Sequence, residues 1–310
     1  MEHEEKCEFE YGKARRGMKN KSSENTRNSW GNDGIKGKVK NRVDLEYNVI
    51  GEQKEVLKRK TVYVYNEDGN KIEISEYNAD DSSRMRTIFT YDNSGNKIEE
   101  LVFVPASVLH SKSIYKYNSF GEISEIVRYS AFGSIMDKYV YEYDEKNSLS
   151  VMSLYKFSNN TPTTKYVYKF SSEGLLRKVV ATNSDDNPDN KNIYKYNMEK
   201  DVKKQLIFHA VRRYYDGSYY WYPDFNWHPD RVIKYKYDKS RNIKKEVENE
   251  MNGVFPVFNN NTDGSKTIYE YDSAGNQYKI SIFIKTGCRF LLFNKYRLDK
   301  IIISSYEYYK

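Results

Sequence analysis

Residues 88–100 read IFTYDNSGNKIEE, and the order of residue types in this stretch decides the fold. Residues 62–74 read VYVYNEDGNKIEI, and residues 268–280 read IYEYDSAGNQYKI. Each stretch has an aliphatic residue and two alternating aromatics, followed by an Asp or Asn, a Gly and an Asn. The chain therefore contains an internal repeat, and a repeat of fixed period defines the architecture of the chain that carries it.

The spacing of the repeat is nearly constant. With the second aromatic as the anchor, five successive intervals are 26, 26, 26, 27 and 26 residues, with 18 before them and 41 and 34 after them. A unit of this length has room for two strands of roughly eight residues and two short connections. The anchors are Tyr47, Tyr65, Tyr91, Tyr117, Tyr143, Phe170, Tyr196, Tyr237 and Tyr271.

The residues before each anchor show the two-residue period of a β-strand. The residue two before the anchor is aromatic in eight of nine units, with Leu45 as the exception, so both rings lie on one face of the strand. The residue three before the anchor is aliphatic in seven units and belongs to the opposite face. We therefore predict that both faces of the sheet are packed or partly covered.

The residues after each anchor predict a tight turn. The next residue is Asp, Asn or Ser in every unit, and each of these can hydrogen-bond the nearby backbone and start a turn. The fourth residue is Gly in six units, which suits a type I turn followed by a left-handed residue. Asn147, Lys200 and Arg241 replace this Gly. We expect the turns at Lys200 and Arg241 to differ from the others.

One repeat is thus a strand, a tight turn, a second strand and a looser turn. Strands joined by short turns are antiparallel, and no long stretch shows the 3.6-residue period of a helix. We predict an all-β fold, an antiparallel β-meander of repeated hairpins with roughly sixteen to eighteen strands, which strand twist bends into a curved or coiled open sheet.

Charge divides the chain into an arm and a repeat domain. Residues 1–11 carry a net −4 and residues 12–42 a net +8, out of +7 in total. We predict an irregular basic N-terminal arm over 1–42, with GNDGIKGK (31–38) as a linker, and a repeat domain over 43–310 with an aromatic insertion at 209–231. Nucleic acid is not an expected partner, since only the basic stretch 12–42 could contribute to binding it.

The chain shows no targeting or disulfide pattern. No apolar run approaches the ~18 residues of a membrane span, and the N-terminus lacks the apolar segment of a secretory signal. Cys7 and Cys288 form no motif for zinc or redox chemistry. These observations leave the localisation open.

The repeated [IV]-Y-x-Y-[DN]-x-x-G-N pattern, seen at 88–96, 114–121 and 268–276, resembles the YD repeat of RHS (rearrangement hotspot) and teneurin-type proteins. The resemblance covers 45–310 and identifies a divergent variant with a longer period. In that family the repeats form a long β-sheet that spirals into a hollow shell. The shell can enclose a C-terminal toxin in bacteria, and other members are adhesive surface modules. The resemblance therefore implies a bacterial protein at the cell surface or outside the cell.

This sequence also departs from the family. Gly-Asn or Gly-Glu follows the turn where the family has Gly-Arg, and no closing motif rich in Asp-Pro and no appended toxin domain is found. The array is short for a large cage. These differences favour the open curved sheet.

The strongest departure from the repeat is RRYYDGSYYWYPDFNWHP (212–229), which lies in the 41-residue interval. Asp216 and Gly217 predict a hairpin turn. Clustered rings can stack on sugar faces, and arginines add positive charge; the same rings can instead cover the end or inner face of the sheet. The candidate ligand-binding residues are Arg212, Arg213, Tyr219, Tyr220, Trp221, Tyr222, Phe225, Trp227 and His228.

No motif for catalysis, metal or nucleotide binding is present. The four histidines share no metal-ligand spacing, and the acidic stretch 183–190 lacks the spacing of a calcium loop. We predict no metal site, no cofactor and no catalytic residue. The Tyr columns are expected to stabilise the sheet through cross-strand packing more than to bind ligand.

Three functions remain open. The leading hypothesis is a non-catalytic binding or structural repeat module that recognises a glycan or a partner protein through aromatic surfaces. The first alternative is an RHS-type shell fragment that encapsulates or chaperones a toxic partner, with unpaired edge strands at Leu45 and Tyr308. The second is a glycan-active enzyme, which needs two carboxylates facing each other across a groove.

Overall fold

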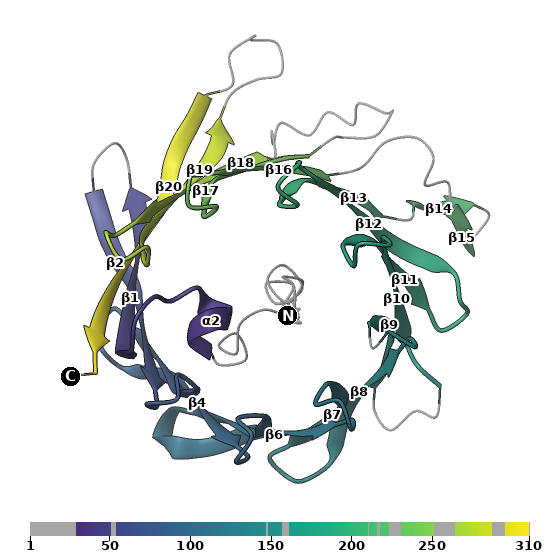
Figure 1. Cartoon of the computed structure of the whole chain (residues 1–310), viewed down its shortest axis with the longest axis horizontal. Helices are drawn as coiled ribbons and strands as arrows, with labels where there is room; N and C mark the ends of the chain where they lie inside the picture. The colour runs from purple at the N-terminus through teal and green to yellow at the C-terminus, as the bar shows by residue number, and fades with distance from the viewer. Residues whose placement is uncertain are drawn as a thin grey trace.

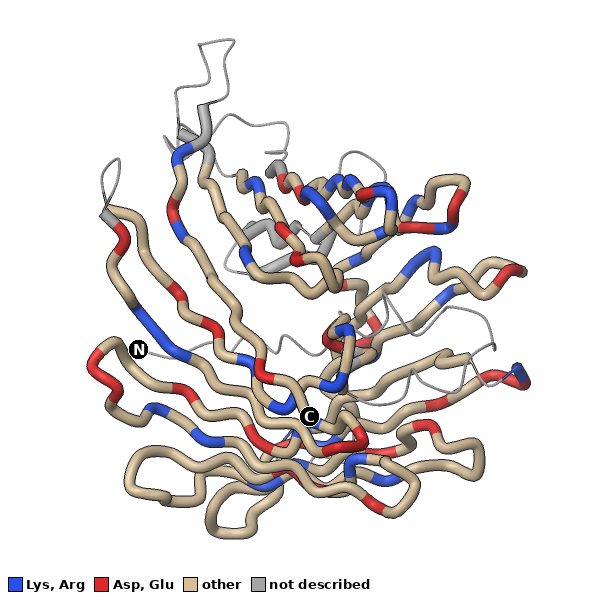
Figure 2. The backbone as a smooth tube through the Cα atoms, turned by 60° about the vertical axis from the view of Figure 1, so that its left-hand side comes forward, with Lys and Arg blue, Asp and Glu red and all other residues tan. Residues whose placement is uncertain are grey.

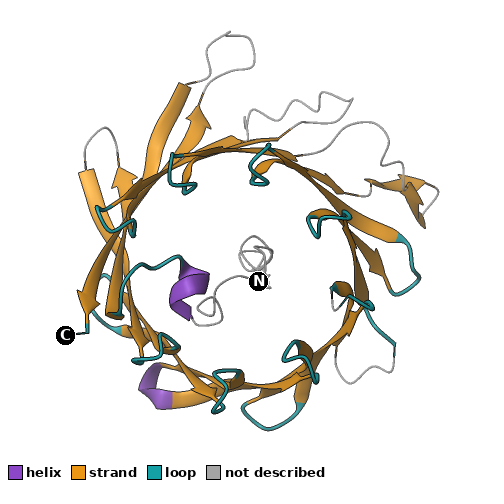
Figure 3. Ribbon diagram, viewed as in Figure 1, coloured by secondary structure: helices purple, strands orange, loops and turns teal. Residues whose placement is uncertain are grey.

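The structure is a computed structural model of the chain. It describes residues 29–50, 54–146, 148–156, 161–209, 211–215, 218–222, 231–250, 264–286 and 295–309. Strands dominate these ranges (Figure 3), as expected from a sequence rich in Tyr, Ile and Val.

Within the described ranges the helical elements are one short α-helix, α2 (Ser29–Asp33), and one 3-10 turn, η1 (Pro105–Ser107). The strands are β1 (Val39–Ile50), β2 (Lys54–Tyr65), β3 (Lys71–Asn78), β4 (Ser83–Tyr91), β5 (Lys97–Val104), β6 (Val108–Tyr117), β7 (Ile123–Ser130), β8 (Ile135–Tyr143), β9 (Leu149–Lys156), β10 (Thr164–Phe170), β11 (Leu176–Asn183), β12 (Pro188–Tyr196), β13 (Val202–His209), β14 (Val211–Tyr215), β15 (Ser218–Tyr222), β16 (Arg231–Tyr237), β17 (Ile243–Glu250), β18 (Gly264–Tyr271), β19 (Gln277–Thr286) and β20 (Lys295–Tyr308).

Eighteen of the described strands form one closed antiparallel barrel (Figure 1). Consecutive strands pair around the ring, β13 pairs with β16 across the insertion, and β20 pairs with β1. The prediction of an all-β antiparallel meander is confirmed, but the prediction of an open sheet is wrong. Leu45 lies opposite both Lys60 and Ile303, and Tyr308 lies opposite Val39, so the edge strands expected of a shell fragment are paired.

A β-bulge that recurs in each hairpin accounts for the curvature that closes the ring. The hairpins from β2–β3 to β18–β19 each shift register at the anchor aromatic, for example between Thr90 and Tyr91. Such a bulge bends the strand and increases its twist. Because the bulge recurs once per repeat, the bend accumulates in one direction, and the last strand meets the first.

The tight turns follow the sequence prediction. In the turn after Tyr91, Asp92 Oδ1 accepts hydrogen bonds from the backbone N–H of Ser94 at 2.9 Å and of Asn96 at 2.8 Å. The Gly95 N–H donates to the Asp92 carbonyl at 3.0 Å, and Gly95 has φ +79°. The order of residue types that recurs in the repeats thus encodes a turn with one left-handed residue.

The expectation that the turns at Lys200 and Arg241 differ is wrong. Both residues adopt the left-handed conformation, with φ +65° and +66°, and both donate the same backbone hydrogen bond as the glycines. A non-glycine residue in this conformation costs about 1 kcal/mol or more. Contacts between neighbouring turns offset this cost at Arg241, whose guanidinium bonds both oxygens of Asp201, at 2.6 and 3.1 Å.

The ninth hairpin of the ring is formed by β20 and β1, which lie at opposite ends of the ring sequence and are not joined by a turn. Six anchor tyrosines after Tyr65 donate from their hydroxyl to a carbonyl of the preceding hairpin, as Tyr91 does to Lys71 at 2.7 Å. Tyr306 in β20 makes the same contact with Gln277, so Tyr306 is a further anchor, and β1 is the return strand of its hairpin. The sequence-based assignment of Tyr47 as the first anchor is wrong, because Tyr47 lies inside β1, opposite Leu57.

The two faces of the wall have different compositions. Residues on the face of Tyr63 and Tyr65 point into the ring, since Tyr65 contacts the segment that lies inside it. Strand register carries this inner face around the barrel, so the paired aromatics of the hairpins from β2–β3 to β18–β19 line the interior near the short turns. The outer face carries an aliphatic row, with Ile88 opposite Leu101 and Ile114 opposite Val127.

The buried apolar residues form small clusters along the inner face rather than one central core. The described clusters are Ile35, Val39 and Tyr65; Ile126, Tyr139 and Met152; and Leu176, Val179 and Tyr194. Charged residues of both signs are distributed along the strands (Figure 2). No helix among the described residues has the length and apolar character needed to cross a bilayer.

Candidate functional site

Residues 29–38 lie inside the ring, at the rim formed by the short turns (Figures 1 and 3). The Tyr65 hydroxyl donates a hydrogen bond to Asp33 Oδ2 at 2.8 Å, and Lys71 Nζ lies 3.0 Å from the same oxygen. The Lys71 backbone N–H donates to Ser29 Oγ at 2.8 Å. Both ends of α2 are therefore attached to the wall at the first short turn.

The segment continues from α2 along the wall through an apolar contact. Ile35 is buried against Val39 and Tyr65. Gly34 and Gly37 have φ of +69° and +85°, a conformation that favours glycine. A Cβ on Gly37 would also approach the Tyr308 ring to 3.2 Å.

The segment leaves the ring between the first and last of the described short turns. The Asn276 side chain, which is fully buried, accepts a hydrogen bond from the Lys36 N–H and donates one to the Lys36 carbonyl at 3.1 Å. It also donates to the Tyr308 hydroxyl at 2.8 Å. The sequence-based assignment of 31–38 as a linker is therefore wrong. No turn joins β20 to β1 at this rim, and residues 31–38 lie there instead. They bind residues at the β2–β3 turn and at the β18–β19 turn.

Burial and the neighbouring Asp33 carboxylate raise the pKa of Tyr65. The hydroxyl therefore stays protonated at neutral pH and donates to Asp33. A hydrogen bond to a charged acceptor in a partly buried site is stronger than one between neutral groups.

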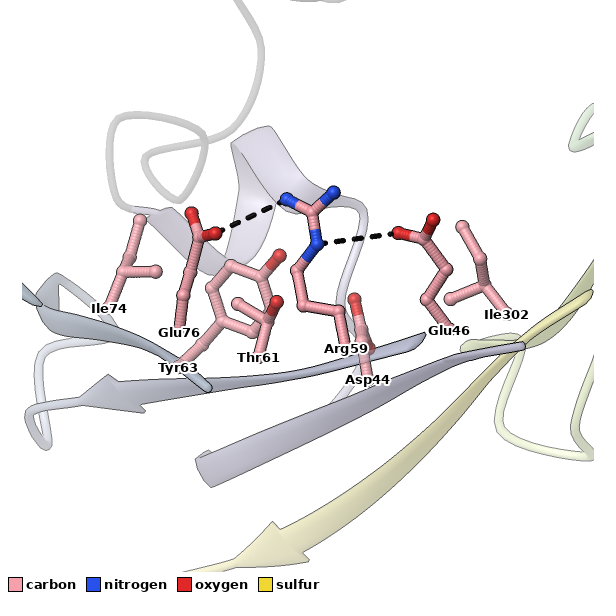
Figure 4. A pocket seen from close by; sticks show the side chains of 8 residues that line it. All are labelled: Asp44, Glu46, Arg59, Thr61, Tyr63, Ile74, Glu76 and Ile302. Atoms are coloured by element: carbon pink, nitrogen blue, oxygen red, sulfur yellow. Dashed lines mark hydrogen bonds and ion pairs between the residues drawn. The ribbon is translucent and has the colours of Figure 1, made fainter. Parts of the chain in front are cut away.

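A second feature of the lumen is a charged pocket of about 260 Å³, which we call the Arg59 pocket (Figure 4). The Arg59 guanidinium lies between two carboxylates, with Nη1 3.2 Å from Glu76 Oε2 and Nε 3.7 Å from Glu46 Oε2. Its lining residues are Asp44, Glu46, Arg59, Thr61, Tyr63, Ile74, Glu76 and Ile302. They come from β1, β2, β3 and β20, so the pocket lies beside the β20–β1 hairpin.

Glu46 is the most heavily paired carboxylate of the pocket. Lys300 Nζ lies 2.9 Å and Lys58 Nζ 3.3 Å from Glu46 Oε1. Burial alone raises the pKa of Glu46, but the hydrogen bond and charge of Lys300, together with Arg59 and Lys58, hold its pKa below the ordinary value. Glu46 is therefore ionised at neutral pH.

Arg42 forms a second ion pair at the edge of the pocket. Its Nε and Nη2 donate to the two oxygens of Asp44, at 2.7 and 2.6 Å, and its guanidinium lies 5.1 Å from the centre of the Tyr63 ring. Burial, with Asp44, raises the pKa of Tyr63 to about 12. The Tyr63 ring thus stays neutral and packs under a paired cation.

Paired polar groups recur around the rest of the inner face. Arg128 in β7 binds Asp137 in β8, and Arg231 in β16 binds Glu248 in β17. Ion pairs of this kind make an interior that suits polar and peptide groups better than apolar ones.

This arrangement offers little for acid–base chemistry. A glycoside hydrolase needs one protonated and one ionised carboxyl group flanking the substrate, whereas Glu46 and Glu76 share Arg59 between them. The part of the chain that the structure describes holds no group of three or more His, Cys, Asp or Glu arranged for a metal ion.

The predicted aromatic site is only partly within the described residues. β14 and β15 pair as a separate two-stranded sheet, with Arg212 opposite Trp221 and Arg213 opposite Tyr220, so the predicted hairpin is confirmed. Tyr219 and Tyr222 lie in β15. Phe225, Trp227, His228 and the Asp216–Gly217 turn lie outside the described residues. The hairpin stands outside the ring in Figure 1, so it does not join the lumen groups.

No pattern in the sequence pointed to the residues of the lumen. Arg59, Glu46 and Asp33 occupy no repeated column, and Glu46 lies in the strand whose anchor was misassigned. Asn276 belongs to the column five residues after the anchor, where Asn70, Asn96 and Asn242 also occur, and nothing in that column distinguishes it. The one available signal was Asp33, the single acidic residue of 25–43.

No protein-family model matches the chain, and no curated protein does. Solved structures with some likeness include a porin-like protein from Bacteroides uniformis, with 8% identity and a TM-score of 0.42 over 87% of this chain and 96% of the other. A TcdB2–TccC3–Cdc42 complex has 11% identity and a TM-score of 0.32 over 82% of this chain and 14% of the other. Transferrin binding protein B from Neisseria meningitidis has 10% identity and a TM-score of 0.18, over 86% and 64%. These scores are all below 0.5, and membership of the YD-repeat family stays a prediction.

Proposed function

We propose that the protein is a non-catalytic binding barrel whose lumen holds polypeptide. The observation that carries the proposal is the segment of residues 29–38, which lies inside the ring and is bound there by wall residues from both neighbouring short turns. The chain itself supplies a peptide ligand and its complex with the wall.

The composition of the lumen supports a ligand with many polar backbone groups. The paired aromatics provide flat apolar surfaces, and the fixed ion pairs and amides between them provide donors and acceptors. Such a surface can hold an extended or turned peptide, as Asn276 does when it pairs with both backbone groups of Lys36. This proposal is closest to the container alternative, with a closed ring in place of an open fragment.

Peptide capture by a ring that lacks its own segment tests the proposal. A chain that starts at Val39 keeps β1 and the whole wall and lacks all of residues 29–38. We expect it to bind a fluorescein-labelled peptide of residues 25–38 with one-to-one stoichiometry in fluorescence anisotropy. The full-length chain, whose site is occupied, should bind the peptide much more weakly. A second variant, full-length Ile35→Asp, expels the segment by placing a charge in an apolar contact and keeps the test available if the truncated chain does not fold. Failure of both variants to bind the peptide, with their β-sheet circular dichroism intact, would overturn the proposal.

The aromatic hairpin supports a second candidate function, recognition of a glycan or a partner protein outside the ring. The supporting observation is that β14 and β15 form a sheet of their own and contribute no strand to the barrel. Trp221→Ala is therefore expected to leave the thermal midpoint within about 1 °C and to reduce glycan-array binding at least tenfold, since one stacked ring contributes about 1–3 kcal/mol. A large fall in the midpoint would show instead that this ring stabilises the fold.

A further inference from the structure

The wall uses the same side-chain set twice, once at Lys71 and once at Lys97. Each lysine stands six residues after an anchor tyrosine, and the other six anchors followed by a described short turn have Ile, Leu, Val or Gln at this position. Lys71 Nζ lies 5.1 Å from the centre of the Tyr63 ring, and Lys97 Nζ lies 5.1 Å from that of Phe89. The two ammonium groups therefore occupy matching places in successive hairpins.

The two lysines obtain their carboxylate partners from different sources. Lys97 Nζ lies 2.8 Å from Glu100 Oε2 of its own strand, and the same oxygen accepts a hydrogen bond from the Tyr115 hydroxyl at 2.9 Å. The residue that corresponds to Glu100 in β3, twenty-six positions earlier, is Ile74. The wall strand thus supplies no carboxylate there, and Asp33 of the inner segment takes that place.

The contacts of Asp33 are of the same kind as those of Glu100, although Tyr65 is an anchor of its own hairpin and Tyr115 stands two residues before the anchor of the next one. Each carboxylate receives one lysine ammonium and one tyrosine hydroxyl on a single oxygen, within 3.0 Å. The Lys71 and Asp33 side chains are only 18% and 23% exposed, so solvent screens the pair less than it would a surface ion pair. A cation held over two aromatic rings, with Ile74 at the position where the next hairpin has Glu100, is a receptor for an external carboxylate.

We infer that Tyr65 and Lys71 form a carboxylate receptor, and that the ligand class of the lumen is a peptide with an Asp followed two residues later by an aliphatic side chain. This inference rests on the proposed function and specifies its ligand. The aliphatic requirement comes from Ile35, which is buried against Tyr65 and Val39. The residue between them is Gly34, whose φ of +69° allows the turn that brings both side chains to the wall.

The residues that the receptor requires explain why it occurs once among the described repeats. It requires a lysine six residues after the anchor and no acidic residue nine residues after it. Lys97 meets the first requirement, but Glu100 fills its site. The other described turns have no lysine at the position.

The inference is tested by measuring how peptide variants bind to the chain that starts at Val39, or to full-length Ile35→Asp. The probe is the labelled peptide of residues 25–38, compared with its Asp33→Ala and Ile35→Ala forms. Loss of a partly buried charged hydrogen bond predicts binding about 10- to 100-fold weaker for Asp33→Ala. Lys71→Met in the wall should weaken binding of the unmodified peptide by a similar factor. It should not weaken binding of the Asp33→Ala peptide any further. Lys97→Met is the matched control, and it should leave the affinity unchanged.

A substitution that imitates the neighbouring hairpin gives the reciprocal test. Ile74→Glu supplies Lys71 with a carboxylate from its own strand, as Glu100 supplies Lys97, and should weaken capture of the peptide at least tenfold. Equal affinity of the Asp33→Ala and unmodified peptides would overturn the carboxylate receptor while leaving the lumen as a peptide site. Absence of binding by every peptide would overturn the proposed function itself, and the inference with it.

Discussion

Tyr306 in β20 lies opposite Arg42 in β1, and the two residues belong to one hairpin although no turn joins their strands. The Tyr306 hydroxyl donates to the Gln277 carbonyl at 2.5 Å, as Tyr91 and Tyr271 do to carbonyls of their preceding hairpins. The barrel is therefore closed by strand pairing between the two ends of the ring sequence. We call this pairing of β1 with β20 the seam of the barrel.

A disulfide across the seam should stabilise the barrel. Val43 and Ser305 lie directly opposite each other, and residues so placed have Cα atoms about 4.5–5.5 Å apart, within the range that a disulfide spans. Val43→Cys with Ser305→Cys, in a chain whose Cys7 and Cys288 are replaced by Ser, closes a very long loop, for which chain entropy predicts roughly 5 kcal/mol. Thermal unfolding of the oxidised form should show a midpoint several degrees above that of the reduced form. The single Val43→Cys variant is the control, and equal midpoints in the two redox states would contradict the prediction.

Acid should weaken the wall at the Arg59 pocket. The pKa of Glu46 is lowered in the folded barrel, so its pairing stabilises the fold at pH values above the unfolded pKa near 4.3. This contribution is lost as the pH falls from there through the folded pKa. Lys300→Met removes the nearest cation, and urea titrations between pH 7 and pH 3 should then show a smaller loss of unfolding free energy on acidification. A pH dependence identical to that of the unmodified chain would show that Glu46 does not control this transition.

The two left-handed non-glycine turns offer a matched pair. Lys200→Gly removes the backbone strain and loses only an exposed ion pair with Glu173, so the free energy of unfolding should rise by about 1 kcal/mol. Arg241→Gly removes the same strain but also the hydrogen bonds to Asp201 and to the Glu199 carbonyl, so it should give no gain or a loss. Urea unfolding of both variants measures the difference, and an equal gain in both would show that the Arg241 contacts contribute nothing.

The anchor hydroxyls can be tested by removing one and adding one. Tyr143 donates to the Ile123 carbonyl at 2.7 Å, so Tyr143→Phe should cost about 1 kcal/mol. Phe170 is the anchor without a hydroxyl, and the corresponding carbonyl in its preceding hairpin is that of Leu149. Phe170→Tyr is therefore expected to be neutral or to stabilise by up to about 1 kcal/mol. A loss of stability in Phe170→Tyr would mean that this hairpin packs differently from its neighbours.

The repeat pattern predicted most of the wall and little of its contents. The Asp92–Gly95 turn could be predicted because its hydrogen bonds are local, and the same side chains recur at each turn. Closure of the ring could not be predicted, because it depends on pairing between β1 and β20, whose sequences differ from the repeat. Ser304, for example, occupies the position two before Tyr306, where the repeat has an aromatic residue.

The carboxylate receptor was hidden for a related reason. Lys71 and Lys97 read as equivalent in sequence, and only the absence of an acid at Ile74 separates them. The partner that fills this gap, Asp33, comes from a stretch whose Gly-rich composition indicates a linker. Its role depends on long-range contacts with Tyr65 and Lys71 at the rim. Periodicity and local propensity carry no information about such contacts.

Closure around an occupied interior also sets an order of events. A polypeptide is made from its N-terminus, so residues 29–38 exist before any strand of the wall, and β20 is the last strand to become available. Pairing β20 with β1 joins the most distant parts of the ring and is intrinsically slow, since contacts of long sequence separation form late. The inner segment thus has the whole time of wall assembly in which to settle against Tyr65. Once the final strand has paired, the occupant is exchanged only through the rims or by reopening the seam.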